Sequence, residues 1–259
     1  MKPLRHRRIL VTRRNDQAGP LVETLSVLGA TVVEVPLLAL APPEDPAPLE
    51  AALARLGGYD WLAFTSANAV VAVAGHLDGL GQALPAPLRL ASVGPTTTRE
   101  IAARFAGRQP DLQPVSQYRA EGLLEAFRAL DLGGSRVLLP VSDLALDVLA
   151  EGLRARAARV DVVVAYRTIV EASAEPAVRG ALDSERIDLV TLASPSAVRA
   201  FALAAGGRAR EVPVAVMGPV TAEAARRAGL DVRAVAEPST AEGLVAAIVA
   251  CLGRAPARR

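Results

Sequence analysis

Residues 8–40 read RILVTRRNDQAGPLVETLSVLGATVVEVPLLAL, and residues 136–168 repeat the pattern as RVLLPVSDLALDVLAEGLRARAARVDVVVAYRT. At the same offset of 128 residues, YDWLAFTSANAV (59–70) matches IDLVTLASPSAV (187–198). Two further matches pair ASVGPTTTREIAARFAG (91–107) with AVMGPVTAEAARRAG (215–229), and AEGLLEAF (120–127) with AEGLVAAI (241–248). An internal duplication of this length predicts two similar structural units.

Short apolar runs recur through both copies. They are rich in Val and Leu and do not alternate with polar residues, which is typical of strands buried on both faces. Amphipathic stretches separate them, for example at 21–28, 123–130 and 244–252. The alternation predicts an α/β fold with parallel sheets and helices on both sides. We expect strands at 9–12, 31–35, 61–65, 88–93, 137–139, 160–165, 189–192, 212–216 and 232–235.

Two segments rich in Pro and acidic residues follow corresponding strands. APPEDPAP (41–48) lies in the first copy and EASAEP (171–176) in the second. Since Pro disfavours helix interiors and central strands, both segments are candidate hinges.

The composition excludes several classes of protein. Of 259 residues, 51% are hydrophobic and 22% charged, which predicts a folded chain with a sizeable core. Aromatic residues make up 3% and the net charge is +2, so a nucleic-acid partner is not expected. No apolar run approaches the roughly 18–20 residues that span a bilayer. The basic start of the chain lacks the apolar core of a signal peptide, and Cys251 is the one cysteine, so we expect a cytoplasmic protein without disulfides.

Motifs for the commoner cofactors are missing from the sequence. It contains no G-x-G-x-x-G after a strand, no Walker A loop, no G-x-S-x-G and no H-E-x-x-H. The two histidines, His6 and His76, are far apart, and His76 is expected to end a helix. The sequence therefore gives little support to zinc, nucleophilic-serine or dinucleotide chemistry, and we predict no metal site.

Small hydroxyl residues follow four of the predicted strands, at matched positions of the two copies. Ligands of parallel sheets bind at such carboxyl ends, where helix N-termini present free amides. N-capping by Ser and Thr is the alternative explanation at each position. The segments are Thr65-Ser66-Ala67-Asn68, Ser194-Pro195-Ser196, Gly94-Pro95-Thr96-Thr97 and Gly218-Pro219-Val220-Thr221.

Arg13 and Tyr166 also stand at strand ends. Arg13 follows the first strand and can be either a ligand contact or a solvated surface residue. Tyr166 lies in the strand that leads to the second candidate hinge. It is either a cleft residue or a half-buried strand tyrosine.

The ordered set ILVTR, FTSANAV, VGPTT, YRT, ASPSAV, MGPVTAEAARRAGL and STAEGL resembles the uroporphyrinogen-III synthase family over nearly the whole chain. The resemblance implies an enzyme that needs no cofactor, a lyase of tetrapyrrole biosynthesis. Members take linear hydroxymethylbilane, invert ring D through a spiro intermediate and close uroporphyrinogen III. They act mainly by positioning a flexible substrate with eight carboxylates.

The resemblance also implies roles for individual residues. Tyr166 takes the place of the family's hinge tyrosine, where a hydroxyl can assist departure of the substrate hydroxyl. The implied substrate-binding residues are Arg13, Thr65, Ser66, Gly94, Thr97, Ser194, Ser196, Gly218 and Thr221.

For the fold, the resemblance implies two flavodoxin-like domains with the chain crossing between them twice. Domain 1 is expected at 1–37 with 170–259, domain 2 at 42–164, and two hinge strands at 38–41 and 165–169. Matched loops, Ser66 with Ser194 and Thr97 with Thr221, would then face one cleft. We further expect a monomer, with a transient contact to hydroxymethylbilane synthase.

One segment departs from the family pattern. An Arg-Gly-Glu/Asp type of sequence is common after the first strand of the second copy, whereas here Val141-Ser142-Asp143 follows. The helix after it ends in Ala157-Ala158 where Gly is usual. A tetrapyrrole-binding or regulatory module without catalysis is therefore the alternative function. A sugar- or nucleotide-binding enzyme would need a Gly-rich phosphate loop, which the sequence lacks.

Overall fold

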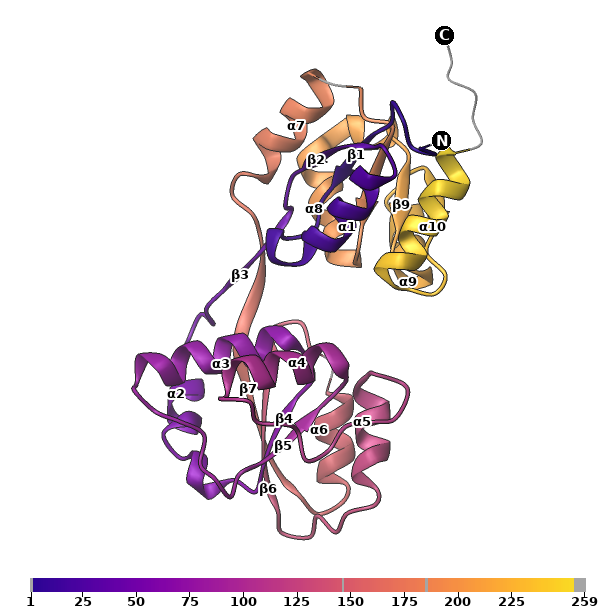
Figure 1. Ribbon diagram of the computed structural model, residues 1–259. Helices are drawn as coiled ribbons and strands as arrows, with labels where there is room; N and C mark the ends of the chain where they lie inside the picture. Colours follow the sequence, from indigo (N-terminus) through magenta and orange to yellow (C-terminus); the bar gives the residue numbers. More distant parts are fainter. Residues whose placement is uncertain (1, 146, 185, 254–259) are drawn as a thin grey trace. The chain divides into compact units, whose positions relative to one another are not determined.

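The structure, a computed structural model, describes residues 2–145, 147–184 and 186–253 (Figure 1). The chain forms two compact units. Unit 1 comprises Met1–Ala39 and Ile169–Arg259, and unit 2 comprises Leu40–Thr168. The chain therefore leaves unit 1 within strand β3 (Leu38–Ala41) and returns within strand β7 (Arg159–Val170).

Unit 1 is built around a five-stranded sheet with the order β10-β9-β8-β1-β2, and all four strand pairs are parallel. Counted along the chain within the unit, this is the 2-1-3-4-5 order of flavodoxin-like folds. Its elements are β1 (Arg8–Val11), α1 (Asn15–Val27), β2 (Thr31–Glu34), α7 (Ala174–Ser184), β8 (Leu189–Leu192), α8 (Pro195–Ala205), the 3-10 helix Gly206–Arg210, β9 (Val214–Val216), α9 (Pro219–Arg227), β10 (Val232–Val235) and α10 (Ala241–Leu252).

Unit 2 has the strand order β3-β7-β6-β4-β5, in which β5-β4-β6-β7 repeats β9-β8-β1-β2 and the fifth strand lies at the opposite edge from that of unit 1. The pairs β4–β5, β4–β6 and β6–β7 are parallel, and β3 takes the edge beside β7. Its remaining elements are α2 (Ala47–Leu53), the 3-10 helix Leu56–Gly58, β4 (Trp61–Phe64), α3 (Ala67–Gly79), β5 (Arg89–Ser92), α4 (Pro95–Arg104), α5 (Ala120–Phe127), β6 (Arg136–Ser142) and α6 (Val148–Arg154).

Strand registers show that the two sequence copies exchange halves. In unit 1, Ile9 of the first copy pairs with Leu189 of the second. In unit 2, Trp61 of the first copy pairs with Val137 of the second, at the equivalent register. Each sheet is thus assembled from both copies, and a cut at the repeat boundary would divide both sheets.

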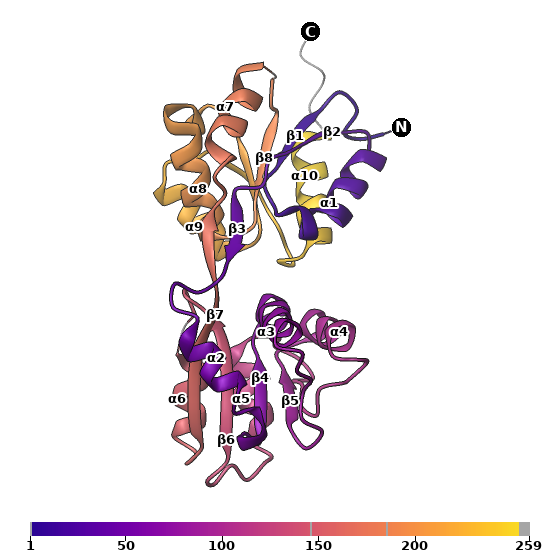
Figure 2. The same cartoon turned by 90° about the vertical axis from the view of Figure 1, so that its left-hand side faces the viewer.

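Each sheet is covered by helices on both faces, and the central strands alternate between two apolar clusters. In β1, Ile9 and Val11 pack on the side of α1 and α10, while Leu10 packs on the side of α7, α8 and α9. Figure 2 shows these two helical layers in unit 1. In β4, Trp61 and Ala63 pack toward α5 and α6, and Leu62 and Phe64 toward α2, α3 and α4. Burial on both faces explains why these strands do not alternate with polar residues.

The nine predicted strands are confirmed, and the segment 38–41 forms β3 as expected. Residues 171–176 are predicted as a hinge segment outside helix and sheet. This is wrong in part, because α7 begins at Ala174. Pro176 lies in its first turn, where proline costs no intrahelical hydrogen bond. Pro48 likewise lies at the start of α2. His76 falls in the last turn of α3, as predicted.

A polar cluster closes the amino ends of the strands in unit 2. Tyr59 Oη donates a 2.6 Å hydrogen bond to Asp161 Oδ2, and the Arg136 guanidinium lies 5.0 Å from the centre of the Tyr59 ring. Burial and then the bond to Asp161 raise the pKa of Tyr59 to about 12. The cluster stands at the opposite ends of β4, β6 and β7 from the predicted site, so it serves as a structural contact.

Within the described part of the chain, no helix is long and apolar enough to cross a membrane.

Candidate functional site

The loop after β4 carries Thr65 and Ser66, both partly exposed at the carboxyl end of the strand. Ser66 is the N-cap of α3, and its Oγ accepts a 3.1 Å hydrogen bond from the Ala69 N–H. The same Oγ lies 3.2 Å from Tyr166 Oη, and either hydroxyl can donate. N-capping, offered as the alternative to a ligand role, is therefore present at Ser66 together with a contact to the predicted catalytic residue.

Tyr166 owes its direction to an irregularity in β7. Val141 pairs with Val164, but the next residue of β6, Ser142, pairs with Tyr166, so Ala165 is an extra residue on β7. Ala165 and Tyr166 pack in the same apolar cluster, although neighbours on a regular strand point to opposite faces. A bulge of this kind re-aims a side chain, and here it brings the tyrosine hydroxyl to the first turn of α3.

The segment that departs from the family pattern supports this strand end. The Asp143 N–H donates a 3.2 Å hydrogen bond to the Tyr166 carbonyl, and Asp143 Oδ1 accepts one of 3.2 Å from the Thr168 N–H. Asp143 therefore binds the backbone on both sides of Arg167. Its contacts position the tyrosine.

Gly94 and Thr97 begin α4 at the carboxyl end of β5. Gly94 is the N-cap and Pro95 the first helical residue, while the Thr97 side chain is buried. A Cβ on Gly94 would lie 2.8 Å from the Cβ of Tyr118. Glycine is thus required by a close approach of the loop that precedes α5.

In unit 1 the loop after β8 repeats the Ser66 geometry. Ser194 Oγ accepts a 3.2 Å hydrogen bond from the Ala197 N–H at the start of α8. Ser196 Oγ accepts a 2.9 Å bond from Arg199 Nη2. Directly after the adjacent strand β1, the buried Thr12 hydroxyl donates to the Thr191 carbonyl at 2.5 Å, which fixes the point where Arg13 leaves the sheet.

Gly218 and Thr221 begin α9 in the same manner as Gly94 and Thr97 begin α4. Gly218 has φ +88°, a conformation that residues with a Cβ rarely adopt, and its Cβ would lie 2.1 Å from Ser239 Oγ. Thr221 is buried, and its Oγ1 donates to the Met217 carbonyl at 3.4 Å. Ser239 stands one residue before the N-cap of α10, as Tyr118 stands before that of α5.

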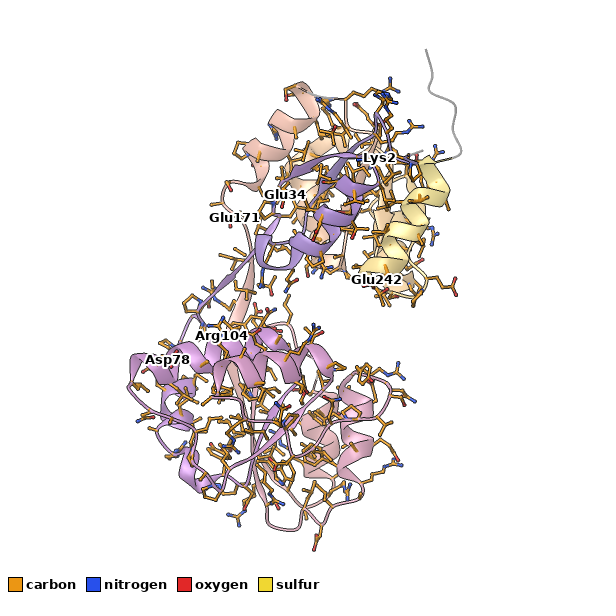
Figure 3. All side chains as sticks on the ribbon, in the orientation of Figure 1. Lys2, Glu34, Asp78, Arg104, Glu171 and Glu242 are labelled. Carbon is orange, nitrogen blue, oxygen red and sulfur yellow. The ribbon has the colours of Figure 1, made fainter. Side chains whose placement is uncertain are left out.

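The helices that start at the predicted loops share an electrostatic property. The first turns of α3, α4, α8 and α9 hold no acidic residue. The first turns of α2, α5, α6, α7 and α10 each hold a glutamate. In α10, hydrogen bonds from the Glu242 N–H and the Thr240 hydroxyl lower the pKa of Glu242, which Figure 3 labels. The positive end of α10 thus faces its own carboxylate, whereas α3, α4, α8 and α9 have none there.

The structure brings some predicted residues together and leaves others apart. In unit 2, Tyr166 and Ser66 are in contact; in unit 1, Arg13, Ser194 and Gly218 lie at the ends of strands that are neighbours or next neighbours. The facing of Ser66 with Ser194, and of Thr97 with Thr221, stays a prediction. Among the residues described, no group of three or more His, Cys, Asp and Glu side chains could hold a metal ion.

Sequence reasoning missed the partners of the loop glycines. Tyr118 and Ser239 stand two residues before the repeated AEGL motifs, but their own types differ, so the alignment of the copies gave no signal. It also missed Arg99, whose Nη2 lies 3.4 Å from Thr96 Oγ1, and Arg199. Both add exposed cations near helix N-termini.

Comparison with known proteins gives a consistent result. A family model described as uroporphyrinogen-III synthase HemD matches residues 19–246. The chain is 31% identical to the uroporphyrinogen-III synthase of Synechococcus elongatus over 95% of this chain and 96% of that protein.

Solved structures show the same fold. A mutant uroporphyrinogen III synthase from the extremely thermophilic bacterium Thermus thermophilus aligns with a TM-score of 0.62 and 20% identity, over 96% of this chain and 100% of that chain. The uroporphyrinogen-III synthetase of Helicobacter pylori aligns with a TM-score of 0.59 and 16% identity, over 94% and 99%.

Proposed function

The chain belongs to the uroporphyrinogen-III synthase family, and we propose that it closes linear hydroxymethylbilane to uroporphyrinogen III with inversion of ring D. This reaction makes it a cyclising lyase. The substrate loses the hydroxyl on its ring A as water, ring D attacks the electrophilic carbon that this leaves to give a spiro intermediate, and fragmentation and reclosure give the III isomer.

The observation that carries the proposal is the set of acid-free helix N-termini. Two belong to unit 2 and two to unit 1, and all four follow the carboxyl ends of strands. Backbone N–H groups at such ends bind carboxylates without long flexible side chains. A substrate with eight carboxylates matches a protein that offers several separate anion sites. Thr65, Ser66, Gly94 and Thr97 would serve in unit 2, and Arg13, Ser194, Ser196, Gly218 and Thr221 in unit 1.

Tyr166 is proposed as the proton donor to the departing hydroxyl. Its side chain is buried, it contacts the Ser66 hydroxyl, and Asp143 binds the backbone beside it. A hydroxyl held in this way can donate at a fixed point with little loss of entropy. The Val141-Ser142-Asp143 segment thus supports the catalytic proposal.

Hinge motion and assembly belong to the same proposal. We place hinge strands at 38–41 and 165–169 between functional domains at 1–37 with 170–259 and at 42–164, because β3 and β7 each run across a unit boundary. Two polypeptide links allow the units to close on a flexible substrate. We propose a cytoplasmic monomer that receives its substrate in transient contact with hydroxymethylbilane synthase.

Isomer analysis tests the function. Hydroxymethylbilane closes spontaneously to the I isomer, so chromatography of a timed reaction separates catalysed from uncatalysed closure. We expect the III isomer to dominate with the protein present. If the III:I ratio equals that of the blank while the protein still binds the tetrapyrrole, the enzymatic function is contradicted and the alternative, a tetrapyrrole-binding module without catalysis, is supported.

A further inference from the structure

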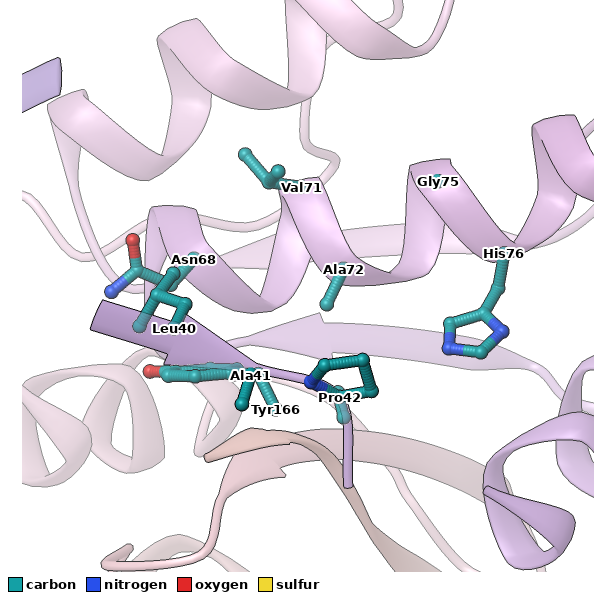
Figure 4. Close-up of a pocket in the computed structure, with 10 residues that line it drawn as sticks. Leu40, Ala41, Pro42, Asn68, Val71, Ala72, Gly75, His76 and Tyr166 are labelled. Atoms are coloured by element: carbon teal, nitrogen blue, oxygen red, sulfur yellow. The ribbon is translucent and has the colours of Figure 1, made fainter. Parts of the chain in front are cut away.

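A pocket of about 310 Å³ lies in unit 2 beside Tyr166 (Figure 4). One wall is α3, through residues that include Asn68, Val71 and His76; the other is β3 with Ala165 and Tyr166 of β7. The volume is at the small end for ligand sites, so the pocket can take one part of a large ligand.

Polar groups stand at both ends of this pocket. Figure 4 shows the Asn68 amide and the Tyr166 hydroxyl at one end, beside Leu40, and the His76 imidazole at the other, with Ala72 and Pro42 between them. None of the ten residues that line the pocket is acidic. His76 is partly exposed and lies in the last turn of α3.

We infer that the pocket receives one pyrrole ring of the substrate, with a carboxylate arm bound by His76. The inference rests on the proposed function, because it places a second contact in the same substrate. A pyrrole ring suits the apolar walls, and an imidazole N–H donates a charge-assisted hydrogen bond to a carboxylate. The ring would lie next to the Tyr166 hydroxyl, so His76 is a positioning residue.

The two histidines of the chain allow a direct test by NMR. Porphobilinogen, a monopyrrole with one acetate and one propionate arm, serves as the probe. We expect it to shift the Cε1–H signal of His76 and not that of His6, which lies in unit 1. The dimethyl ester of the probe should shift neither. Equal shifts of both signals, or no shift at high probe concentration, would overturn the inference.

Kinetics then separate positioning from catalysis. His76→Ala should raise KM about tenfold, as expected for loss of a charge-assisted hydrogen bond, with kcat little changed. His76→Gln keeps a donor and should recover part of the loss. His76→Glu should raise KM further by charge repulsion, whereas Gln82→Glu, an exposed change six residues along that does not line the pocket, should not.

Failure of the two proposals can be told apart. If the probe shifts the His76 signal selectively but the III:I ratio equals that of the uncatalysed reaction, the pocket proposal stands and the enzymatic function is contradicted. If the III isomer dominates but His76→Ala has the KM of the wild type, the enzymatic function stands and the pocket proposal is contradicted. A fall in kcat at constant KM would also overturn the positioning role.

Discussion

The N–H of Arg8 donates a 2.8 Å hydrogen bond to Asp188 Oδ2, and the N–H of Asp188 donates back to the Arg8 carbonyl at 2.9 Å. Arg136 and Asp60 make the same two bonds at 2.8 and 2.9 Å. Arg136 is the repeat equivalent of Arg8, and Asp188 that of Asp60, so each carboxylate binds a strand of the other copy. The exchange of halves is thus fixed at the first residue of β1 and of β6.

This reciprocity predicts where a mutation acts. Asp188→Ala leaves the Arg8 N–H without its side-chain acceptor, at a cost of about 1–3 kcal/mol. It should speed hydrogen exchange in β1, far away in sequence, and leave unit 2 protected. Asp60→Ala should do the opposite, with faster exchange in β6. Equal acceleration in both units, measured by mass spectrometry of peptic peptides, would contradict the assignment.

Two tyrosines make a matched pair for testing the catalytic proposal. Tyr166→Phe removes the hydroxyl beside Ser66 and should lower kcat roughly tenfold or more, as for loss of a proton donor, with the fold retained. Tyr59→Phe removes a hydroxyl of similar burial at the other end of the sheet, bound to Asp161. It should lower stability and leave kcat unchanged. If Tyr166→Phe and the wild type have equal activity, Tyr166 is not the proton donor.

Tyr59 also predicts a dependence of stability on pH. Its pKa is raised from 10.0 to about 12 in the folded protein, first by burial and then by the hydrogen bond to Asp161. The neutral phenol is favoured in the folded state, so its contribution is complete below pH 10 and is lost between pH 10 and about 12.

Urea unfolding followed by fluorescence of Trp61 measures this effect, because the single tryptophan is buried in unit 2. The wild-type midpoint should fall over that range more steeply than the midpoint of Tyr59→Phe. Parallel curves for the two proteins would show that Tyr59 does not titrate as described.

The sheets were predictable from the sequence because their strands are buried on both faces. Continuous apolar runs such as 189–192 then mark strands directly, and the duplication gives their pairing pattern. The position of Ser66 was predictable for the same reason, since a hydroxyl after a buried strand caps the next helix.

The contacts that orient the side chains and loops of the candidate site were not predictable from the sequence. The bulge at Ala165 depends on the pairing of β7 with β6, and the support from Asp143 depends on that bulge. The contacts of Gly94 with Tyr118 and of Gly218 with Ser239 join loops that carry no apolar periodicity. Hydrophobic patterning therefore locates the site, whereas loop packing determines its geometry.

The residues that follow α1 and the equivalent helix α6 differ in a way that costs conformational energy. Gly29 after α1 has φ +98°, and its repeat equivalent after α6, Ala157, has φ +60°. The hydrogen bonds are the same, since the Ala30 N–H reaches the Leu25 carbonyl and the Ala158 N–H the Leu153 carbonyl. Alanine thus occupies a left-handed conformation that costs an L-residue about 1–2 kcal/mol.

Ala157→Gly should therefore stabilise unit 2 by about 0.5–1 kcal/mol, because relief of the strain exceeds the added chain entropy of glycine. Ala157 is exposed, so no packing is lost. Ala155→Gly is the control: this residue is also exposed but is right-handed at the C-cap of α6, and the change should destabilise by a similar amount. The urea midpoint read from Trp61, which packs in the same cluster as Leu153 of α6, should move in opposite directions in the two variants. A loss of stability in both would mean that Ala157 is not strained.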